Sequence, residues 1–394
     1  MNEDKAARYQ RLHRRARMLT AGWIVLLLVL VLTTGVSRSM GDASLGLVHR
    51  LGIPALIATA ASAGLYAVVL ACLLEAGTLP LTFYSSVVLE RRFGLSRQRL
   101  GPWLADHVRG LAIGLGLWGA AAGFIYACMM AWPHWWWMPA WAGVAAVGVA
   151  LTWVAPVALL PLFLRMAPLE NDALRTRLVA LVRQVGTEPV DIYQWRQNDR
   201  TSRANAALVG LGRTRRVLVS DTLVHEYSTD EIEMILAHEL SHHVRHDVWR
   251  GLAFEALVAA AGLWAASRAL PVCAVALGLR GTHDVAGLPV LVLTALGVSV
   301  MALPLGNARS RSAERRADRF ALNLTGNADV FVTAMRRLAA QNLAEDDPPL
   351  LARCFFNTHP PMLERITRAR AWAATRPSVP QTRESSPGPP LRLE

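Results

Sequence analysis

The chain has 394 residues, of which 53% are hydrophobic, and it carries a formal net charge of +12. A mean hydropathy of +0.29 is high for a globular protein of this length and predicts membrane-spanning segments. The four cysteines are scattered without CxxC spacing, so we expect neither a structural disulfide nor a thiolate metal site.

Six apolar stretches are long enough to cross a bilayer. They lie at residues 18–37, 54–76, 108–131, 138–164, 251–270 and 286–306. The first is longer than a signal-peptide core and lacks a convincing small-residue cleavage site, so we interpret it as a retained anchor. We therefore expect a predominantly α-helical polytopic membrane protein with about six transmembrane helices.

The positive charge is nearly all arginine, and the arginines alternate between the loops. Residues 1–17, 165–250 and the region after 307 are rich in arginine, whereas 38–50 and 271–285 carry little. This pattern follows positive-inside sorting and places both termini and the large polar segments in the cytoplasm. It also explains the net charge without a nucleic-acid partner. The arginine-rich, nearly lysine-free composition favours a bacterial source, and hence the inner membrane.

The chain divides into five parts by hydropathy. These are a membrane domain with four spans (1–165), a cytoplasmic polar segment (166–250), a transmembrane hairpin (251–306), a second polar segment (307–372) and a disordered tail (373–394).

The first polar segment has the pattern of a small α/β domain. An amphipathic helix is expected to end at Gly186, followed by strands at 190–196, 205–212 and 217–221. A further helix begins at Ser228 or Thr229, either of which is a suitable N-cap.

This last helix contains the sequence HExxH, from His238 to His242. Residues i and i+4 lie on one helix face, so both imidazoles can reach one metal ion, while Glu239 can act on water as a general base. A catalytic zinc site of this kind keeps three protein ligands and one open position. The alternative interpretation is a solvent-exposed polar helix face on which the histidines only contribute to solubility.

The third ligand is expected on the helix that leaves the sixth span. Glu314 and Asp318 share one helix face there. If the helices are continuous, His242 and Glu314 both lie about 12–14 Å from the hydrocarbon edge. Glu314 is therefore the candidate ligand, and Asp318 is expected to accept a ring N–H from a ligand histidine. Without this agreement in height, the preferred interpretation of Glu314 and Asp318 would be an exposed helix face that forms salt bridges with neighbouring arginines. His243 and His246 are weaker candidates for ligation.

Three segments resemble the integral-membrane HExxH metalloproteases of the type I CAAX prenyl endopeptidase family, to which the HtpX proteases are related. They are ILAHELSHH, SAERRADRFA and NTHPPMLERI, and the similarity extends over most of residues 80–370. The resemblance implies a cytoplasmic zincin-like α/β protease domain. It assigns one zinc ion per chain to His238, His242 and Glu314, and water activation to Glu239.

The resemblance also implies further site residues. Asn205 and Ala206 match an edge strand that binds the substrate backbone, and His359 and Arg365 match groups that stabilise the oxyanion. Ser241 stands where the family usually has glycine. The eukaryotic members have seven spans, whereas this sequence has six.

The leading hypothesis is an integral-membrane zinc metalloendopeptidase acting on peptide or protein substrates within or at the lipid bilayer. CAAX-like processing of prenylated proteins and quality control of membrane proteins are both open. The alternative is a non-catalytic zinc-containing membrane scaffold or transporter-like protein, which the presence of Glu239 disfavours because a closed structural site needs no base.

Overall fold

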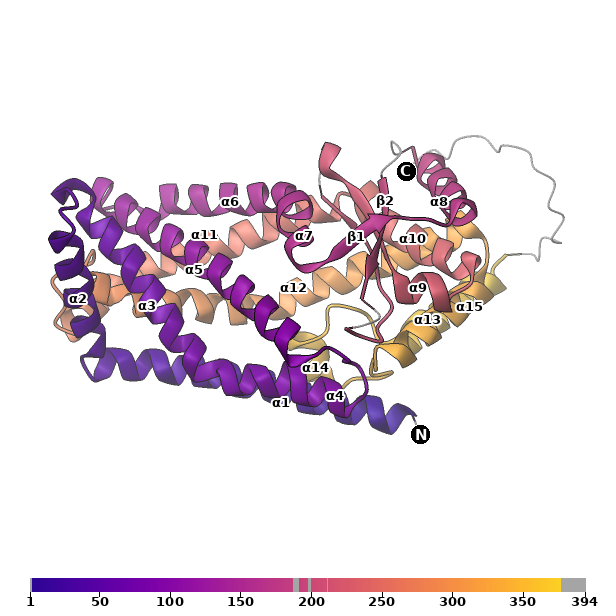
Figure 1. Ribbon diagram of the computed structural model, residues 1–394, viewed down its shortest axis with the longest axis horizontal. Helices are drawn as coiled ribbons and strands as arrows, with labels where there is room; N and C mark the ends of the chain where they lie inside the picture. Colours follow the sequence, from indigo (N-terminus) through magenta and orange to yellow (C-terminus); the bar gives the residue numbers. More distant parts are fainter. Residues whose placement is uncertain (1, 187–190, 198–199, 211, 377–394) are drawn as a thin grey trace.

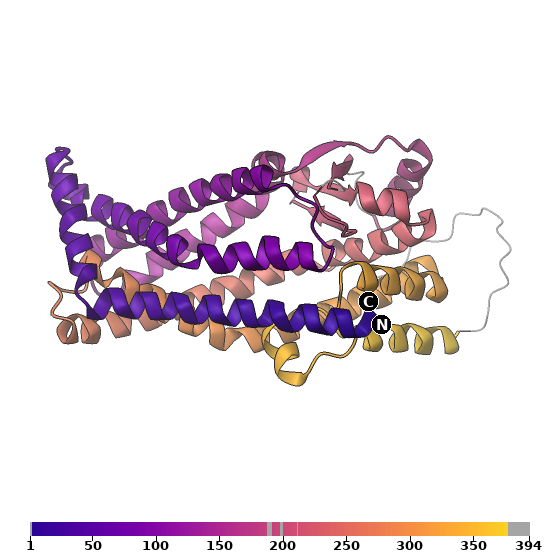
Figure 2. The same ribbon diagram turned by 60° about the horizontal axis from the view of Figure 1, so that its bottom comes forward.

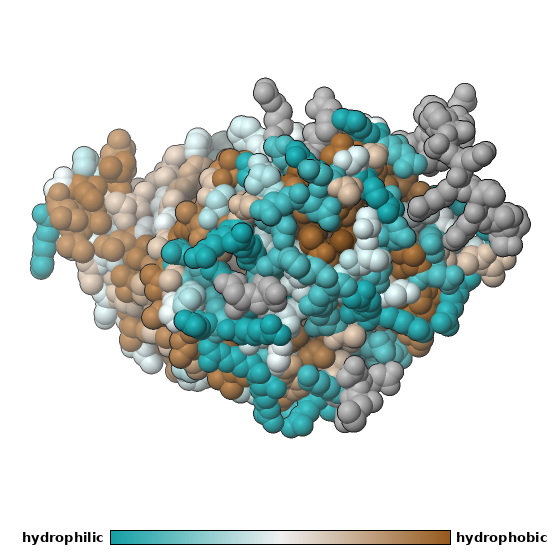
Figure 3. All heavy atoms as spheres, turned by 45° about the vertical axis from the view of Figure 1, so that its right-hand side comes forward, coloured by the Kyte–Doolittle hydropathy of each residue, from teal (hydrophilic) through white to brown (hydrophobic). Residues whose placement is uncertain are grey.

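The computed structural model describes residues 2–186, 191–197, 200–210 and 212–376. A bundle of long helices forms one end of the molecule, and a small sheet surrounded by shorter helices forms the other (Figure 1). Figure 3 shows the second end as a largely hydrophilic surface, with hydrophobic side chains gathering behind it on the helix bundle.

Six helices of the described part are long and apolar enough to span a membrane, which confirms the expected number. The first five of these helices in chain order include α3, which continues through a π-helical turn. They are α1 (Asn2–Thr33), α3 (Ala55–Phe83, then η1 Tyr84–Leu89 and α4 Glu90–Arg92), α5 (Leu100–Ala131), α6 (Trp137–Ala158) and α11 (Asp247–Ala276). The sixth is α12 (Leu288–Thr325), preceded by the 3-10 turn η3 (Val285–Gly287).

Glycines allow α3 and α5 to approach closely. A Cβ atom at Gly64 would lie 3.0 Å from the carbonyl oxygen of Gly119, and one at Gly123 would lie 3.1 Å from the carbonyl oxygen of Ala60. Helices in a membrane gain no hydrophobic free energy by associating, so they depend on close van der Waals packing, which small residues permit.

The helix α2 (Val36–Arg50) lies across the outer end of the bundle, as Figure 1 shows. Its small buried residues, among them Ser37 and Gly41, face the bundle, and the Ser37 hydroxyl lies 2.6 Å from the carbonyl oxygen of Ala286. The sequence did not predict this helix, because its exposed face mixes polar and apolar residues.

The sheet has four strands in the order β1-β2-β4-β3. Its strands are β1 (Arg165–Pro168), β2 (Asp191–Arg196), β3 (Ala206–Val209) and β4 (Arg216–Ser220). β4 is parallel to β2 and antiparallel to β3, which leaves β3 at an edge. The three expected strands are present, but β3 ends at Val209 instead of residue 212, and Asp221 begins a helix instead of ending a strand. Residues 190 and 211 lie outside the described part. β1 was not predicted.

Shorter helices complete this end of the molecule. They are α7 (Leu160–Phe163), α8 (Asp172–Gln184), η2 (Gly212–Thr214), α9 (Asp221–Glu226), α10 (Thr229–Val244), α13 (Ala328–Gln341), α14 (Leu350–Phe355) and α15 (Met362–Ala374). Leu178, Val217, Leu236 and Phe331 are fully buried between them, so sheet and helices share one core. The expected disordered tail began at residue 373, but residues 373 and 374 belong to α15, and residues 377–394 lie outside the described part.

The expected continuous helix from the HExxH motif into the membrane is wrong. α10 ends at Val244, and His246 adopts a left-handed conformation with φ 55° before α11 begins at Asp247. Left-handed geometry cannot continue a right-handed helix, so the chain turns at this residue. His246 therefore does not continue the face that carries His238 and His242.

Candidate metal centre and active site

The helix α10 is fixed at its start by a capping box. Ser228 is the N-cap: its hydroxyl accepts a hydrogen bond from the backbone N–H of Glu231, and the Glu231 carboxylate accepts one from the backbone N–H of Ser228. This reciprocal pair satisfies two amides that a helix start leaves free. Leu236 and Leu240 of α10 are buried in the core, which leaves the histidines of the helix facing α12.

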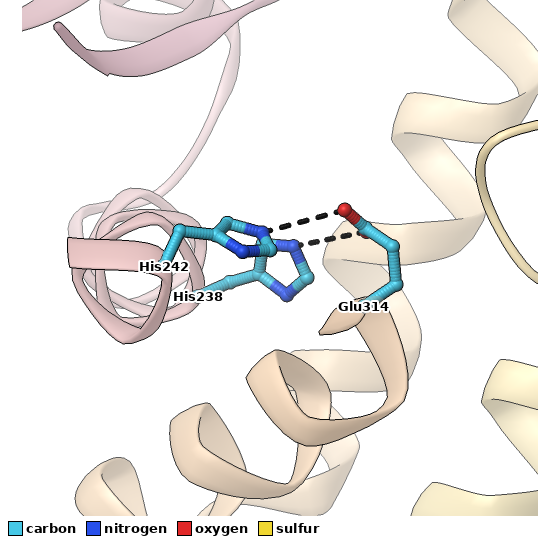
Figure 4. Close-up of side chains that lie close together, drawn as sticks. All are labelled: His238, His242 and Glu314. Atoms are coloured by element: carbon cyan, nitrogen blue, oxygen red, sulfur yellow. Dashed lines mark ion pairs between the residues drawn. The ribbon is translucent and has the colours of Figure 1, made fainter. Parts of the chain in front are cut away.

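His238 and His242 of α10 point toward Glu314 of α12 (Figure 4). Nε2 of His238 lies 3.2 Å from Glu314 Oε2, and Nε2 of His242 lies 3.3 Å from Glu314 Oε1. One ligand atom from each residue can be chosen so that all three lie within 4.8 Å of one another. Among the described residues, this is the cluster of histidine and acidic side chains that could hold a metal ion.

These distances fit a zinc ion. Ligands of a tetrahedral zinc lie about 2.0–2.2 Å from the ion and hence about 3.3–3.5 Å from one another. Glu314 is also buried, and a buried carboxylate is costly unless positive or hydrogen-bonding groups surround it. The donor set of two imidazoles and one carboxylate is the type found in catalytic zinc sites.

Carboxylates stand behind both histidine rings. Nδ1 of His238 lies 3.0 Å from Asp318 Oδ1, and Nδ1 of His242 is hydrogen-bonded to Asp247 Oδ2 at 3.0 Å. Burial alone would lower the pKa of His238, but the carboxylates of Asp318 and Glu314 outweigh it and raise this pKa to about 9. The pKa of His242 is raised for the same reasons by Glu314 and Asp247.

The contact of Asp247 with His242 was not predicted from the sequence. Under the assumption of a continuous helix, a residue five positions after His242 lies on a different face. The turn at His246 brings Asp247 back to the ring. The only signal in the sequence was an acidic residue close to the motif.

A cavity of about 410 Å³ opens in front of the histidines. Seven of the residues singled out from the sequence line it: Asn205, Ala206, His238, Glu239, Glu314, His359 and Arg365. Residues from α13 and the N-terminal helix complete its wall, including Gln10, which sequence reasoning did not single out. The structure thus gathers at one cavity residues that are separated by more than 150 positions in the chain.

Glu239 lies in the wall of this cavity, beside the histidine pair. Burial raises the pKa of its carboxyl group, while His238 and His242 act in the opposite direction. A raised pKa suits a group that must take up a proton near neutral pH and release it again.

His359 and Arg365 approach the cluster from its other side. Nδ1 of His359 lies 2.8 Å from Glu314 Oε2, and its side chain is 64% exposed. Arg365 is buried, and its Nε donates a hydrogen bond to Asp318 Oδ2 at 2.9 Å, with a second bond from Nη2 to Oδ1. Arg365 therefore holds Asp318 as well as facing the cavity, a contact that the sequence did not predict.

Asn205 and Ala206 approach from the sheet. Ala206 opens the edge strand β3 and pairs with Val219 of β4. The backbone of Asn205 is held by Ser220, whose hydroxyl accepts its N–H at 3.0 Å and whose N–H reaches its carbonyl oxygen at 2.9 Å. The opposite edge of β3 carries no strand within the described part.

Two family models match the chain. The model described as peptidase family M48 matches residues 168–373, and the one described as CAAX prenyl protease N-terminal, five membrane helices, matches residues 2–165. The second region holds the helices α1, α2, α3, α5 and α6, of which all but α2 are candidate spans.

Curated proteins and a solved structure are also similar. An uncharacterized metalloprotease of Bacillus subtilis, YhfN, is 29% identical over 74% of this chain and 69% of its own length. A CAAX prenyl protease 1 homolog of Oryza sativa is 25% identical over 73% and 68%. The crystal structure of S. mikatae Ste24p superposes with a TM-score of 0.79 at 20% identity, covering 93% of this chain and 88% of that one.

Membrane-spanning helices joined to a sheet-and-helix domain, in which HExxH faces a glutamate from a neighbouring helix, define an integral-membrane zinc metalloprotease. The chain belongs to peptidase family M48. Its fold is that of the Ste24p structure, and its substrates are peptides or proteins.

Proposed function

We propose that the protein is a metalloendopeptidase of the bacterial inner membrane that carries one zinc ion per chain. His238, His242 and Glu314 hold the metal, and Glu239 is the catalytic base. The observation that carries this assignment is the convergence of two Nε2 atoms and a buried carboxylate on one point beside Glu239.

When bound, the zinc ion would act as a Lewis acid that lowers the pKa of water and polarises the scissile carbonyl group. Glu239 accepts the proton of the attacking water and returns it to the leaving amine, for which its raised pKa is suited. His359 and Arg365 face the same cavity and donate hydrogen bonds to the oxygen that becomes negative during attack. Asp318 and Asp247 hold the two histidine rings in orientation.

The substrate is proposed to bind as an added strand along β3, through Asn205 and Ala206. An exposed sheet edge offers main-chain hydrogen bonds that read little of the sequence, which suits an enzyme that acts on varied extended segments. We propose membrane-associated or misfolded proteins as substrates. The relatives named CAAX prenyl proteases make prenylated peptides the second class to be tested.

The arginine distribution supports a cytoplasmic location for both termini and for the active site. We propose that the protease domain is assembled from residues 166–250 and 307–372, with the membrane domain 1–165 and the hairpin 251–306 holding these parts together.

The test is a comparison of detergent-purified wild type with Glu239→Gln. Glutamine keeps the shape but cannot take up the proton, so cleavage of unfolded casein and of a prenylated CAAX peptide should fall about a thousandfold. Bound metal should remain at one equivalent. Glu233→Gln, on the same helix but paired with Arg177, is the matched control and should cleave normally. Undiminished cleavage by Glu239→Gln would refute the assignment of the base.

Glu314→Ala separates metal binding from chemistry. Removal of this carboxylate should lower the metal content measured by atomic emission, and cleavage should fall with it. A variant that retains a full equivalent of zinc would show that Glu314 is not a ligand.

A further inference from the structure

The substrate-binding strand β3 is short and depends on the chain that leads into it. It has four residues and pairs on one side only. The three residues Ala204, Asn205 and Ala206 line the cavity, so the position of this stretch decides where a bound peptide would lie relative to Glu239. Arg203 directly precedes it.

The guanidinium group of Arg203 is held by two residues of the membrane helices. Its Nη2 lies 2.9 Å from Glu90 Oε2 and 3.0 Å from Glu90 Oε1, and it donates to the hydroxyl of Tyr9 at 2.7 Å. Tyr9 donates in turn to Glu90, and His13 lies 3.4 Å from the same carboxylate. Tyr9 is 3% exposed and the Glu90 side chain 14%, whereas the Arg203 side chain is 39% exposed, so the cluster is packed around Tyr9 and Glu90 and open to solvent at Arg203.

The backbone before Arg203 is joined to the same place. Thr201 forms an isolated bridge with Ser96, and its hydroxyl donates to the carbonyl oxygen of Leu95 at 2.8 Å. The N–H of Ser202 also reaches the Leu95 carbonyl oxygen, at 3.2 Å. The approach to β3 is therefore fastened to the end of the helix that carries Glu90.

The π-helical turn η1 (Tyr84–Leu89) ends immediately before Glu90. A π-turn contains one extra residue, which rotates all later side chains by about 100° relative to a regular α-helix. The irregular turn thus determines which way Glu90 faces, and it faces Tyr9 and Arg203.

The N-terminal helix α1 also contacts the segment that follows α13. The side-chain amide of Gln10 donates to the carbonyl oxygen of Leu343 at 2.8 Å. Leu343 has φ 49°, a conformation that a leucine adopts only where its surroundings impose it. Figure 2 shows that the start of α1 reaches the sheet-and-helix end of the molecule. Adjacent residues Tyr9 and Gln10 therefore contact both Arg203, before β3, and Leu343, after α13.

We propose that Arg203 is a positioning residue whose guanidinium group, held by Glu90 and Tyr9, fixes the substrate-binding strand β3 to the membrane helices. A partly exposed ion pair of this kind contributes little net stability, because solvent screens the attraction, so the proposed role is orientation of the chain before β3. The inference rests on the proposed function, since it concerns the strand that would bind the substrate.

The first test measures cleavage of fluorescein-labelled, unfolded casein by the full-length protein in detergent. Glu90→Gln and Arg203→Gln should raise KM about tenfold, because each loses hydrogen bonds between charged groups, and kcat should change less than about threefold. Arg203→Lys should stay within about threefold of the wild-type KM. Glu233→Gln is the control. It removes the carboxylate partner of Arg177, an arginine that is as exposed as Arg203 but remote from the cavity, and it should leave KM unchanged.

The second test does not need activity. Amide hydrogen exchange at residues 204–209 should accelerate about tenfold in Glu90→Gln and Arg203→Gln but not in Glu233→Gln. Tyr9→Phe keeps the ion pair and serves if the charge variants fail to fold; it should show a smaller acceleration in the same segment. Unchanged exchange in these variants, or equal losses in kcat and unchanged KM, would overturn the inference. Failure of the wild type to cleave casein would instead count against the proposed function and leave the exchange result standing.

Discussion

His238 and His242 both turn Nε2 toward Glu314, while Nδ1 of each ring faces a further carboxylate. This arrangement fixes which nitrogen is free for the metal. Asp318 is held by the buried guanidinium group of Arg365, whereas Asp247 lies 3.6 Å from Arg250 and from Arg316. The two carboxylates are similarly buried and differ in their partners, since the arginines beside Asp247 are more exposed than Arg365.

Asp247→Asn should weaken zinc binding about tenfold, because a neutral amide orients the His242 ring less firmly and makes it less basic. Affinity can be measured by competition with a chromophoric chelator. Asp230→Asn, at the start of the same α10 helix and paired with Arg177, is the control and should bind zinc as the wild type does. Equal affinities for all three proteins would show that Asp247 does not support the ligand.

Zinc affinity should also depend on pH. Because the pKa of His238 is raised to about 9, the metal-free protein holds a proton on this ring at neutral pH, and zinc must displace it. As the pH falls from 9 to 7, affinity should therefore decrease by about one decade per unit for each proton displaced, a total of about a hundredfold for one proton. Calorimetry in two buffers of different ionisation enthalpy would count the protons released at pH 7. A value near zero would contradict the raised pKa.

At the scale of elements, the regular geometry of helices made the site predictable, and the left-handed conformation of one residue, His246, limited the prediction. The spacing of His238 and His242 fixes their common face in any α-helix, and α12, which continues unbroken out of the sixth span, carries Glu314 to them. The turn at His246 could not be predicted, since only a few per cent of residues other than glycine adopt the left-handed conformation that His246 has here. The contact of Asp247 with His242 was lost with it.

The elements that escaped prediction are those whose stability comes from tertiary contacts. The helix α2 buries Ser37, Gly41, Ser44 and Val48, of which only valine is strongly apolar, and β1 pairs with β2 without a clear alternation of apolar residues. Neither leaves an apolar periodic pattern in its own sequence. The π-turn before Glu90 is similarly invisible, because nothing in YSSVVL distinguishes it from a regular helix.

The close contact between α3 and α5 can be tested with two glycines of one helix. A Cβ atom at Gly119 would lie 3.1 Å from Val68 Cγ2 and 3.3 Å from the Gly64 carbonyl oxygen, whereas one at Gly116 would meet nothing within 4 Å. Gly119→Leu should therefore destabilise the protein by about 1–3 kcal/mol through overpacking. Thermal midpoints in detergent at one heating rate should fall for Gly119→Leu and not for Gly116→Leu. An equal effect of both substitutions would mean that close packing at Gly119 is not the cause.

At the scale of the whole molecule, α1 connects the two halves of the protein. It crosses the bundle and then continues to the protease end, where Arg14 pairs with Glu345 at 2.6 Å (Figure 2). The sequence showed an arginine-rich segment before the first span but gave no partner for it, because such a contact depends on how the chain folds back. Charge patterning predicts which side of the membrane a segment occupies and not what it touches.

The orientation of the whole molecule follows from the same charges and can be measured in intact bacteria. In a variant with Cys72, Cys128, Cys273 and Cys354 replaced by alanine, Ser39→Cys on α2 should react with a membrane-impermeant maleimide, because positive-inside sorting places α2 at the outer face. Arg99→Cys, just before α5, should react only after permeabilisation. Both positions are exposed, so permeabilised cells provide the control for reactivity. Labelling of Arg99→Cys but not Ser39→Cys in intact cells would place the active site on the outer face and overturn the proposed topology.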